Sequence, residues 1–134
     1  MTGKQRTFAR VLFVLYLVAV AWLCFGKFSS VPDVPRSFWG IPTDKVVHFL
    51  MFFPYPILAF FAFDPRTKTV RSTLLWTAAT FLTGCAVAGV TEIIQAKYLP
   101  YRMGDLADFK ADLLALAIAS AFVCIIDILK LKRS

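Results

Sequence analysis

The chain is poor in the residues that usually carry soluble chemistry. It has one histidine and three cysteines among 134 residues, and only 17% of its residues are charged. The cysteines, Cys24, Cys85 and Cys124, lie in apolar segments without a C-x-x-C pair, so they predict small buried side chains and no disulfide. A lone His48 cannot supply the usual zinc ligands. Nucleophile, zincin and P-loop motifs are absent too. The sequence therefore predicts no metal and no cofactor.

Hydrophobic residues, in contrast, are abundant. They make up 59% of the chain, which includes 14 phenylalanines and has a mean hydropathy of +0.70. A small globular core could not bury so many. Four apolar stretches each approach the roughly 20 residues that a helix needs to cross a bilayer. The sequence predicts an all-α integral membrane bundle, one domain over residues 1–134, with four transmembrane helices at approximately 9–27, 45–63, 74–95 and 109–129.

The first apolar stretch also has features of a signal peptide. A basic start precedes it, and Ala19-Val20-Ala21 resembles a cleavage site. The apolar run continues past this triplet to Cys24 and Phe25, which favours a retained helix.

The basic residues predict the orientation. Nine lysines and arginines fall in the N-terminus, the loop after the second stretch and the tail, where only Asp64 and Asp127 oppose them. The opposite side carries six basic and six acidic residues, so one side accounts for the whole net charge of +7. By the positive-inside rule, both termini are predicted to be cytoplasmic. No basic stripe interleaves with exposed aromatic residues, so no nucleic-acid partner is indicated.

Polar residues gather at the edges of three apolar stretches. They are Asp44, Lys45 and His48 at the start of the second, Glu92 and Gln95 at the end of the third, and Arg102, Asp105, Asp108 and Asp112 at the entry to the fourth. Ionisable groups at membrane depth are costly and commonly functional. The predicted topology brings all three groups to one outer rim, where His48, Glu92, Arg102 and Asp108 are expected to lie within contact distance.

Each of these residues also has a structural interpretation. Asp44 and Asp105 are typical N-caps of the second and fourth helices. His48 could be a hydrogen-bonded core residue. Glu92 lies inside the apolar stretch and needs a partner such as Arg102, Lys45 or His48. In the second stretch, Pro54 and Pro56 predict a kink.

The ordered set of motifs resembles the VanZ-like membrane protein family. The resemblance rests on Asp44-Lys45-x-x-His48, Glu92-x-x-Gln95 and Pro100-x-Arg102-x-Gly104-Asp105-x-x-Asp108, over about half the chain. The chain departs from the family pattern at Asp112, where the family usually has Asn, and at Ala115, where it usually has Gly. If position 112 supplies only a hydrogen bond, Asp112→Asn should leave activity nearly intact.

The resemblance implies a multi-pass protein of the bacterial cytoplasmic (inner) membrane, and its founding members are associated with teicoplanin resistance. We expect an outer-rim site for a lipid headgroup or lipid-linked cell-envelope precursor, with Lys45 and Arg102 pairing with phosphate. An enzyme acting on a lipid-linked phosphate or glycan is the alternative. It would use His48, Glu92 or Asp108 as general acid or base, and Mg²⁺ enters only there. A small proton-coupled transporter that uses Glu92 is a further alternative. The oligomeric state is not indicated.

Overall fold

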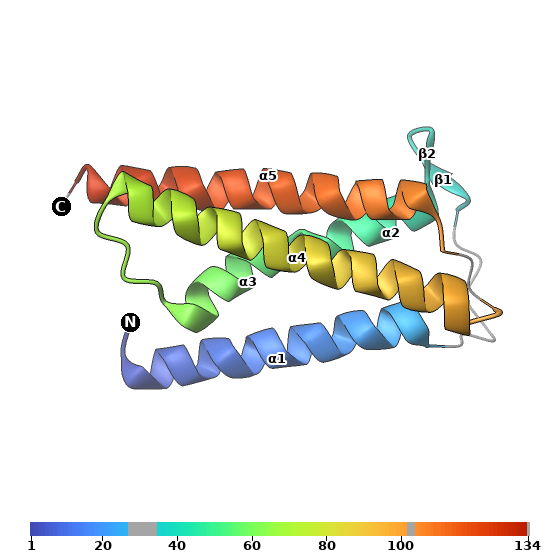
Figure 1. Cartoon of the computed structure of the whole chain (residues 1–134), viewed down its shortest axis with the longest axis horizontal. Helices are drawn as coiled ribbons and strands as arrows, with labels where there is room; N and C mark the ends of the chain where they lie inside the picture. Colours follow the sequence, from blue (N-terminus) through green and yellow to red (C-terminus); the bar gives the residue numbers. More distant parts are fainter. Residues whose placement is uncertain (27–34, 102–103, 134) are drawn as a thin grey trace.

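The computed structural model describes residues 1–26, 35–101 and 104–133 (Figure 1). Its helices are α1 (Gly3–Phe25), α2 (Thr43–Phe52), α3 (Pro54–Phe63), α4 (Val70–Tyr98) and α5 (Leu106–Leu131). With α2 and α3 taken together as Thr43–Phe63, the described chain contains four helices long and apolar enough to cross a membrane. This confirms the predicted number and type of the apolar helices. Helices α4 and α5 continue beyond both of their predicted ends.

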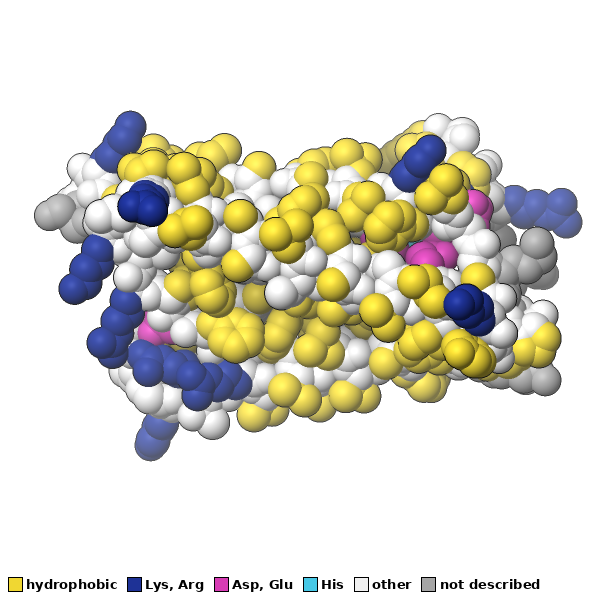
Figure 2. All heavy atoms as spheres, in the orientation of Figure 1, with side chains coloured by type: hydrophobic (Ala, Val, Ile, Leu, Met, Phe, Trp, Pro, Cys, Tyr) yellow, Lys and Arg dark blue, Asp and Glu magenta, His cyan; other side chains and the backbone are white. Residues whose placement is uncertain are grey.

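The helices run side by side along the long axis of the molecule (Figure 1). Both termini and the connection between α3 and α4 lie at one end. A short hairpin and the connection between α4 and α5 lie at the other, which we call the hairpin end (Figure 1). Hydrophobic side chains cover the middle of the face seen in Figure 2, and lysines and arginines lie towards both ends. This distribution is typical of a protein whose middle faces lipid.

The predicted kink separates α2 from α3. Phe53 joins the two helices, and Pro54 is the first residue of α3. Proline has no backbone N–H to continue a helical ladder, so the break falls where the sequence predicts it. Because of the break, α2 packs mainly on α5, whereas α3 packs mainly on α1. The kink thus directs the start of the second span, which carries Lys45 and His48, towards α5.

Small residues let α4 approach its neighbours closely. Thr80, Gly84 and Ala88 are buried along one face of α4. A Cβ atom added at Gly84 would lie 2.6 Å from Cδ2 of Leu116 in α5, which is itself completely buried. Close contact through small residues stabilises helix pairs where lipid supplies no hydrophobic driving force.

The hairpin consists of β1 (Ser37–Phe38) and β2 (Ile41–Pro42), which pair antiparallel. Trp39 and Gly40 form its two-residue turn, and both have positive φ angles. Such turns require left-handed backbone at both central positions, which glycine adopts readily. The Trp39 side chain is fully exposed, in keeping with an interfacial aromatic residue.

Polar contacts also join the helices at the end of the bundle where both termini lie. The buried Asp127 of α5 accepts hydrogen bonds of 2.6 Å from the hydroxyls of Thr67 and Thr73. Nearby, Arg6 of α1 forms an ion pair with Asp64 at 2.8 Å. These contacts fasten α5 to the start of α4, and α1 to the end of α3.

Thr73→Val should destabilise the bundle by about 1–3 kcal/mol, because it removes a hydroxyl donor from the buried Asp127 without changing side-chain size. Thr77→Val is the matched control, since the Thr77 hydroxyl donates only to the Thr73 carbonyl within α4. Thermal unfolding in detergent measures both. Equal stability of the two variants would contradict a structural role for Asp127.

Candidate ionic site at the hairpin end

Lys45 is the centre of the first half of the site. Its Nζ lies 2.8 Å from Asp44 Oδ2, 2.7 Å from Asp105 Oδ2 and 2.5 Å from Asp108 Oδ1. An ammonium group has three N–H donors, and three carboxylates use them. Because Asp105 precedes α5 and Asp108 lies in its first turn, these bonds join the start of α2 to the start of α5.

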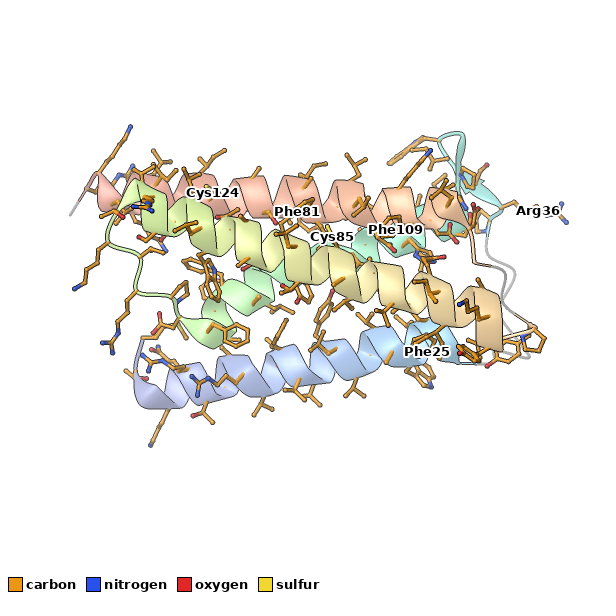
Figure 3. All side chains as sticks on the ribbon, viewed as in Figure 1. Phe25, Arg36, Phe81, Cys85, Phe109 and Cys124 are labelled. Atoms are coloured by element: carbon orange, nitrogen blue, oxygen red, sulfur yellow. The ribbon has the colours of Figure 1, made fainter. Side chains whose placement is uncertain are left out.

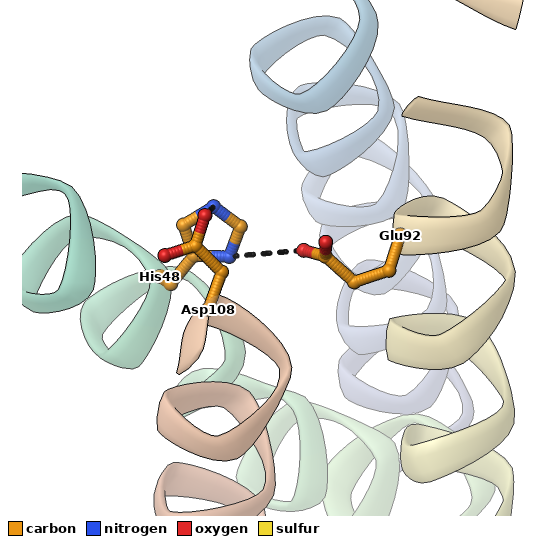
Figure 4. A group of neighbouring side chains, drawn as sticks. All are labelled: His48, Glu92 and Asp108. Atoms are coloured by element: carbon orange, nitrogen blue, oxygen red, sulfur yellow. Dashed lines mark ion pairs between the residues drawn. The ribbon is translucent and has the colours of Figure 1, made fainter. Parts of the chain in front are cut away.

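His48 is the centre of the second half. Its Nδ1 lies 3.0 Å from Asp112 Oδ1, and its Nε2 lies 3.5 Å from Asp108 Oδ2. Glu92 Oε1 of α4 is 3.8 Å from Nδ1. Figure 4 shows the Glu92 carboxylate pointing across the gap from α4 towards the imidazole, with Asp108 beside the ring. His48, Glu92 and Asp112 are buried. Three helices therefore meet at one imidazole.

A glycine and an N-cap hold Glu92 against the start of α5. The backbone N–H of Asp105 donates to Glu92 Oε2 at 3.1 Å, and the Asp105 side chain accepts from the N–H of Ala107, which caps α5. A Cβ atom at Gly104 would lie 2.9 Å from the Glu92 carbonyl oxygen and 2.8 Å from Ala96 Cβ. Only glycine lets this segment approach α4 so closely.

The exposed Asp105 carboxylate lies outside the helical spans. The hydrogen bond from Lys45 lowers its pKa, and the N–H of Ala107 acts in the same direction. Because the pKa of Asp105 is lower in the folded than in the unfolded state, the contact stabilises the fold fully at pH values above the usual pKa of an aspartate. This stabilisation is lost as the pH falls through the lowered pKa.

The described site has more negative than positive groups. Its carboxylates are Asp44, Glu92, Asp105, Asp108 and Asp112. Lys45 and His48 are the basic groups in contact with them, whereas Arg36, at the same end, points away from the bundle (Figure 3). Glu92 Oε1 and Asp112 Oδ2 are buried and have no hydrogen-bond partner within residues 1–26, 35–101 and 104–133. Buried unpaired carboxylate oxygens are costly, so these two atoms mark where the site can accept a further donor or cation.

Two apolar grooves border the ionic cluster. One, of about 630 Å³, lies between the hairpin, α2 and α5, and Lys45 lines it together with Phe38, Phe49, Ala111 and Leu114, among others. The other, of about 400 Å³, lies between α4 and α5 and includes Glu92 and Asp105. Acidic atoms are visible in a hollow between apolar side chains near the hairpin end in Figure 2. The cluster is therefore open to apolar surfaces on two sides.

The structure brings together most of the residues that the sequence singled out. Gln95 is an exception, because its amide donates to the Cys24 carbonyl at 2.8 Å and ties α4 to α1. Arg102 lies outside the described residues. Asp44 is not the N-cap of α2: Pro42 occupies that position, and Asp44 pairs with Lys45 in the first turn. Asp105 does cap α5, as predicted.

Two contributors were undervalued from the sequence. Asp112 was expected among the polar residues at the entry to the fourth helix, but not as a partner of His48; it is completely buried and contacts His48 directly. The spacing of four residues from Asp108 to Asp112, on the same helix face, was the available signal. Gly104 had no signal beyond its place in the motif, since its close approach to α4 depends on tertiary packing.

Two groups in the site have the donor atoms and spacing for a metal ion. His48, Glu92 and Asp108 form one, and Asp44, Asp105 and Asp108 form the other, each with one ligand atom per residue within 4.8 Å of the others. Lys45 lies among the carboxylates of the second group.

Gly104→Ala should destabilise the bundle by about 1–3 kcal/mol, because the new methyl group must push the start of α5 away from the α4 backbone. Gly89→Ala is the control: its Cβ would meet only Phe109 at an ordinary 3.7 Å. Thermal unfolding in detergent compares them. A greater loss of stability in Gly89→Ala than in Gly104→Ala would contradict the close packing of Gly104 on α4.

No family model matches the chain, and neither a curated protein nor a solved structure matches it. The resemblance to VanZ-like proteins thus rests on the motif residues alone.

Proposed function

We propose that the chain is a VanZ-like multi-pass membrane protein that binds the polar head of a lipid or lipid-linked cell-envelope precursor at the ionic site. The observation that carries this proposal is the position of a buried ionic cluster beside two apolar grooves that share residues with it. A ligand with a polar head and an apolar tail matches both surfaces at once.

The tail would lie in the groove between the hairpin, α2 and α5. Its lining is almost entirely apolar apart from Lys45. Phe49 and Leu114 would pack against its methylene groups by van der Waals contact, since a tail that moves from lipid into the groove gains no hydrophobic driving force. The groove between α1 and α4 is equally apolar, but none of the residues that line it, among them Leu17 and Ile94, is charged. Only a groove next to the ionic cluster can hold both parts of an amphiphile.

The chemistry of the cluster restricts the head. Ionised carboxylates only accept hydrogen bonds, and the N–H groups of Lys45 are already engaged by three of them. This arrangement supports a head rich in hydroxyl, amide or ammonium donors more than a bare phosphate bound by Lys45. The sugars and amines of cell-envelope precursors are heads of this kind.

The same proposal places both termini in the cytoplasm and the hairpin end at the outer face of a bacterial cytoplasmic membrane. The positive-inside distribution of lysine and arginine supports this orientation, and both termini lie at the same end of the bundle (Figure 1). A site at the outer face would meet precursors after their translocation, which agrees with a contribution to teicoplanin resistance.

The orientation predicts which engineered thiols are accessible. In a background with the native cysteines changed to alanine, Ser37→Cys in the hairpin should react with a membrane-impermeant maleimide added to intact cells. Lys68→Cys in the α3–α4 connection should react only after lysis. Both positions are exposed. Labelling of Lys68→Cys alone in intact cells would invert the proposed topology.

The head chemistry predicts lipid preference. Purified protein in a neutral detergent should retain phosphatidylethanolamine better than phosphatidylcholine with the same acyl chains. It should also retain a sugar-bearing polyprenyl diphosphate better than phosphatidylcholine. The reason is that an ammonium or hydroxyl head donates hydrogen bonds to carboxylates and a choline head cannot. Native mass spectrometry measures the bound lipid.

Ala111→Phe fills the groove beside Lys45 and should lower this binding at least several-fold. Ala86→Phe, in the groove between α1 and α4, is the matched control and should bind as the parent does. Equal loss in both variants, or no preference among the lipids, would contradict the proposal.

An enzyme is the second candidate, and one contact favours it. His48 Nδ1 and Asp112 Oδ1 are 3.0 Å apart, an arrangement in which a carboxylate orients an imidazole for general acid or base catalysis. The distinguishing assay offers a lipid-linked diphosphate in liposomes with and without Mg²⁺. Product formation would favour the enzyme, and binding without turnover would favour the headgroup site. A solute-dependent pH change would favour the transporter that the buried Glu92 also suggests.

A further inference from the structure

The two carboxylate groups of the site share Asp108 but differ in their cations. Asp108 Oδ1 lies 2.5 Å from Lys45 Nζ, so the group of Asp44, Asp105 and Asp108 has an ammonium at its centre. Asp108 Oδ2 faces the other way, 3.5 Å from His48 Nε2. Among the residues that the structure describes, the group of His48, Glu92 and Asp108 has no positive charge except that of a protonated His48.

The second group has the dimensions of a coordination site. One donor atom from each of His48, Glu92 and Asp108 lies within 4.8 Å of the other two. Ligands at about 2.1 Å from one ion are separated by roughly 3–4 Å. Small side-chain movements would therefore close the group around an ion. The three donors come from α2, α4 and α5, so the bundle itself sets their spacing.

Glu92 gives independent evidence that the group accepts a ligand. The residue is 9% exposed, and its Oε1 has no hydrogen-bond partner among the residues that the structure describes. Its other oxygen accepts the N–H of Asp105, which fixes the direction of the carboxylate. Oε1 then faces the Nδ1 side of the imidazole at 3.8 Å, across the gap between the helices (Figure 4). A buried carboxylate oxygen held in this direction without a donor is suited to a cation.

Asp112 orients the His48 imidazole as a ligand for a cation. An ionised carboxylate at Nδ1 can only accept, so a neutral ring keeps its proton on Nδ1. An ion would then bind the lone pair of Nε2, in place of a proton shared with Asp108 Oδ2 at 3.5 Å. A carboxylate behind a histidine ligand is the usual outer-shell partner in metal sites, because it fixes the ring and strengthens the donor nitrogen.

We propose that His48, Glu92 and Asp108 bind one divalent transition-metal ion, with Asp112 as the positioning residue behind His48. One imidazole and two carboxylates suit Mn²⁺ or Zn²⁺ better than Ca²⁺, which takes oxygen ligands. The sequence analysis predicted no metal because the chain has one histidine and no paired cysteines. The carboxylates that lie beside the imidazole come from other helices, so the sequence alone does not show them together. The proposal goes beyond headgroup binding, since the ion binds whether or not the grooves hold a lipid.

The test uses tag-free full-length protein in detergent, stripped with a chelator and titrated with Mn²⁺ and Zn²⁺. Mn²⁺ is followed by the loss of the free-ion EPR signal and Zn²⁺ by competition with a chromophoric chelator. We expect one ion per chain. Glu92→Gln and His48→Gln should each weaken binding by more than a hundredfold, and Asp112→Asn by about 10- to 100-fold. Asp64→Asn, an acidic residue at the opposite end, should bind as the parent does.

Helical circular dichroism and gel filtration establish that each variant is folded. The parent protein alone can overturn the proposal: if it binds neither ion, His48 is the second cation of the cluster and no metal site exists. Binding that survives both Glu92→Gln and His48→Gln would place the ion elsewhere and equally refute it. Lipid retention is measured separately, on protein from which metal has been removed with a chelator. The headgroup proposal can therefore fail or hold independently of the metal titration.

Discussion

The rest of the site depends on one interaction, the Lys45 ammonium held by three carboxylates. It joins the first turn of α2 to the N-cap and first turn of α5, at 2.5–2.8 Å. Ions removed from water must be paired with good geometry, otherwise their burial destabilises the fold. With Lys45 in place, Asp108 presents its second oxygen to His48, and Asp105 presents its backbone N–H to Glu92. The ion pair therefore orders the groups that face a ligand.

Backbone features make this pairing possible. The break at Pro54 lets α2 lean on α5 while α3 packs on α1. Gly104 lets the start of α5 touch the α4 backbone beside Glu92. Neither feature takes part in binding, yet each sets a distance in the site. The grooves on either side follow from the same arrangement, because the hairpin and the diverging helices leave apolar surfaces uncovered next to buried charge.

Much of this could be predicted from the sequence. Hydropathy predicted the four helices, and the prolines predicted the break between α2 and α3. The polar residues at the edges of three apolar stretches, together with the expected topology, predicted a polar rim. The partners could not be predicted. Spacing along one helix cannot show that Lys45 takes three carboxylates, that Asp112 backs His48, or that Gln95 faces α1, because each contact depends on the rotation and depth of a second helix.

Lys45 and Asp108 hold α2 and α5 together and so create the site. A double-mutant cycle with Lys45→Met and Asp108→Asn, measured by unfolding in detergent, tests it most directly. Lys45→Met leaves the buried Asp108 without its ammonium partner. Asp108→Asn leaves Lys45 with only the exposed carboxylates of Asp44 and Asp105, whereas the double change removes both charges of the pair. We predict that the double variant is more stable than the sum of the single losses implies, with a coupling energy of about 1–3 kcal/mol. Strictly additive losses would contradict the account.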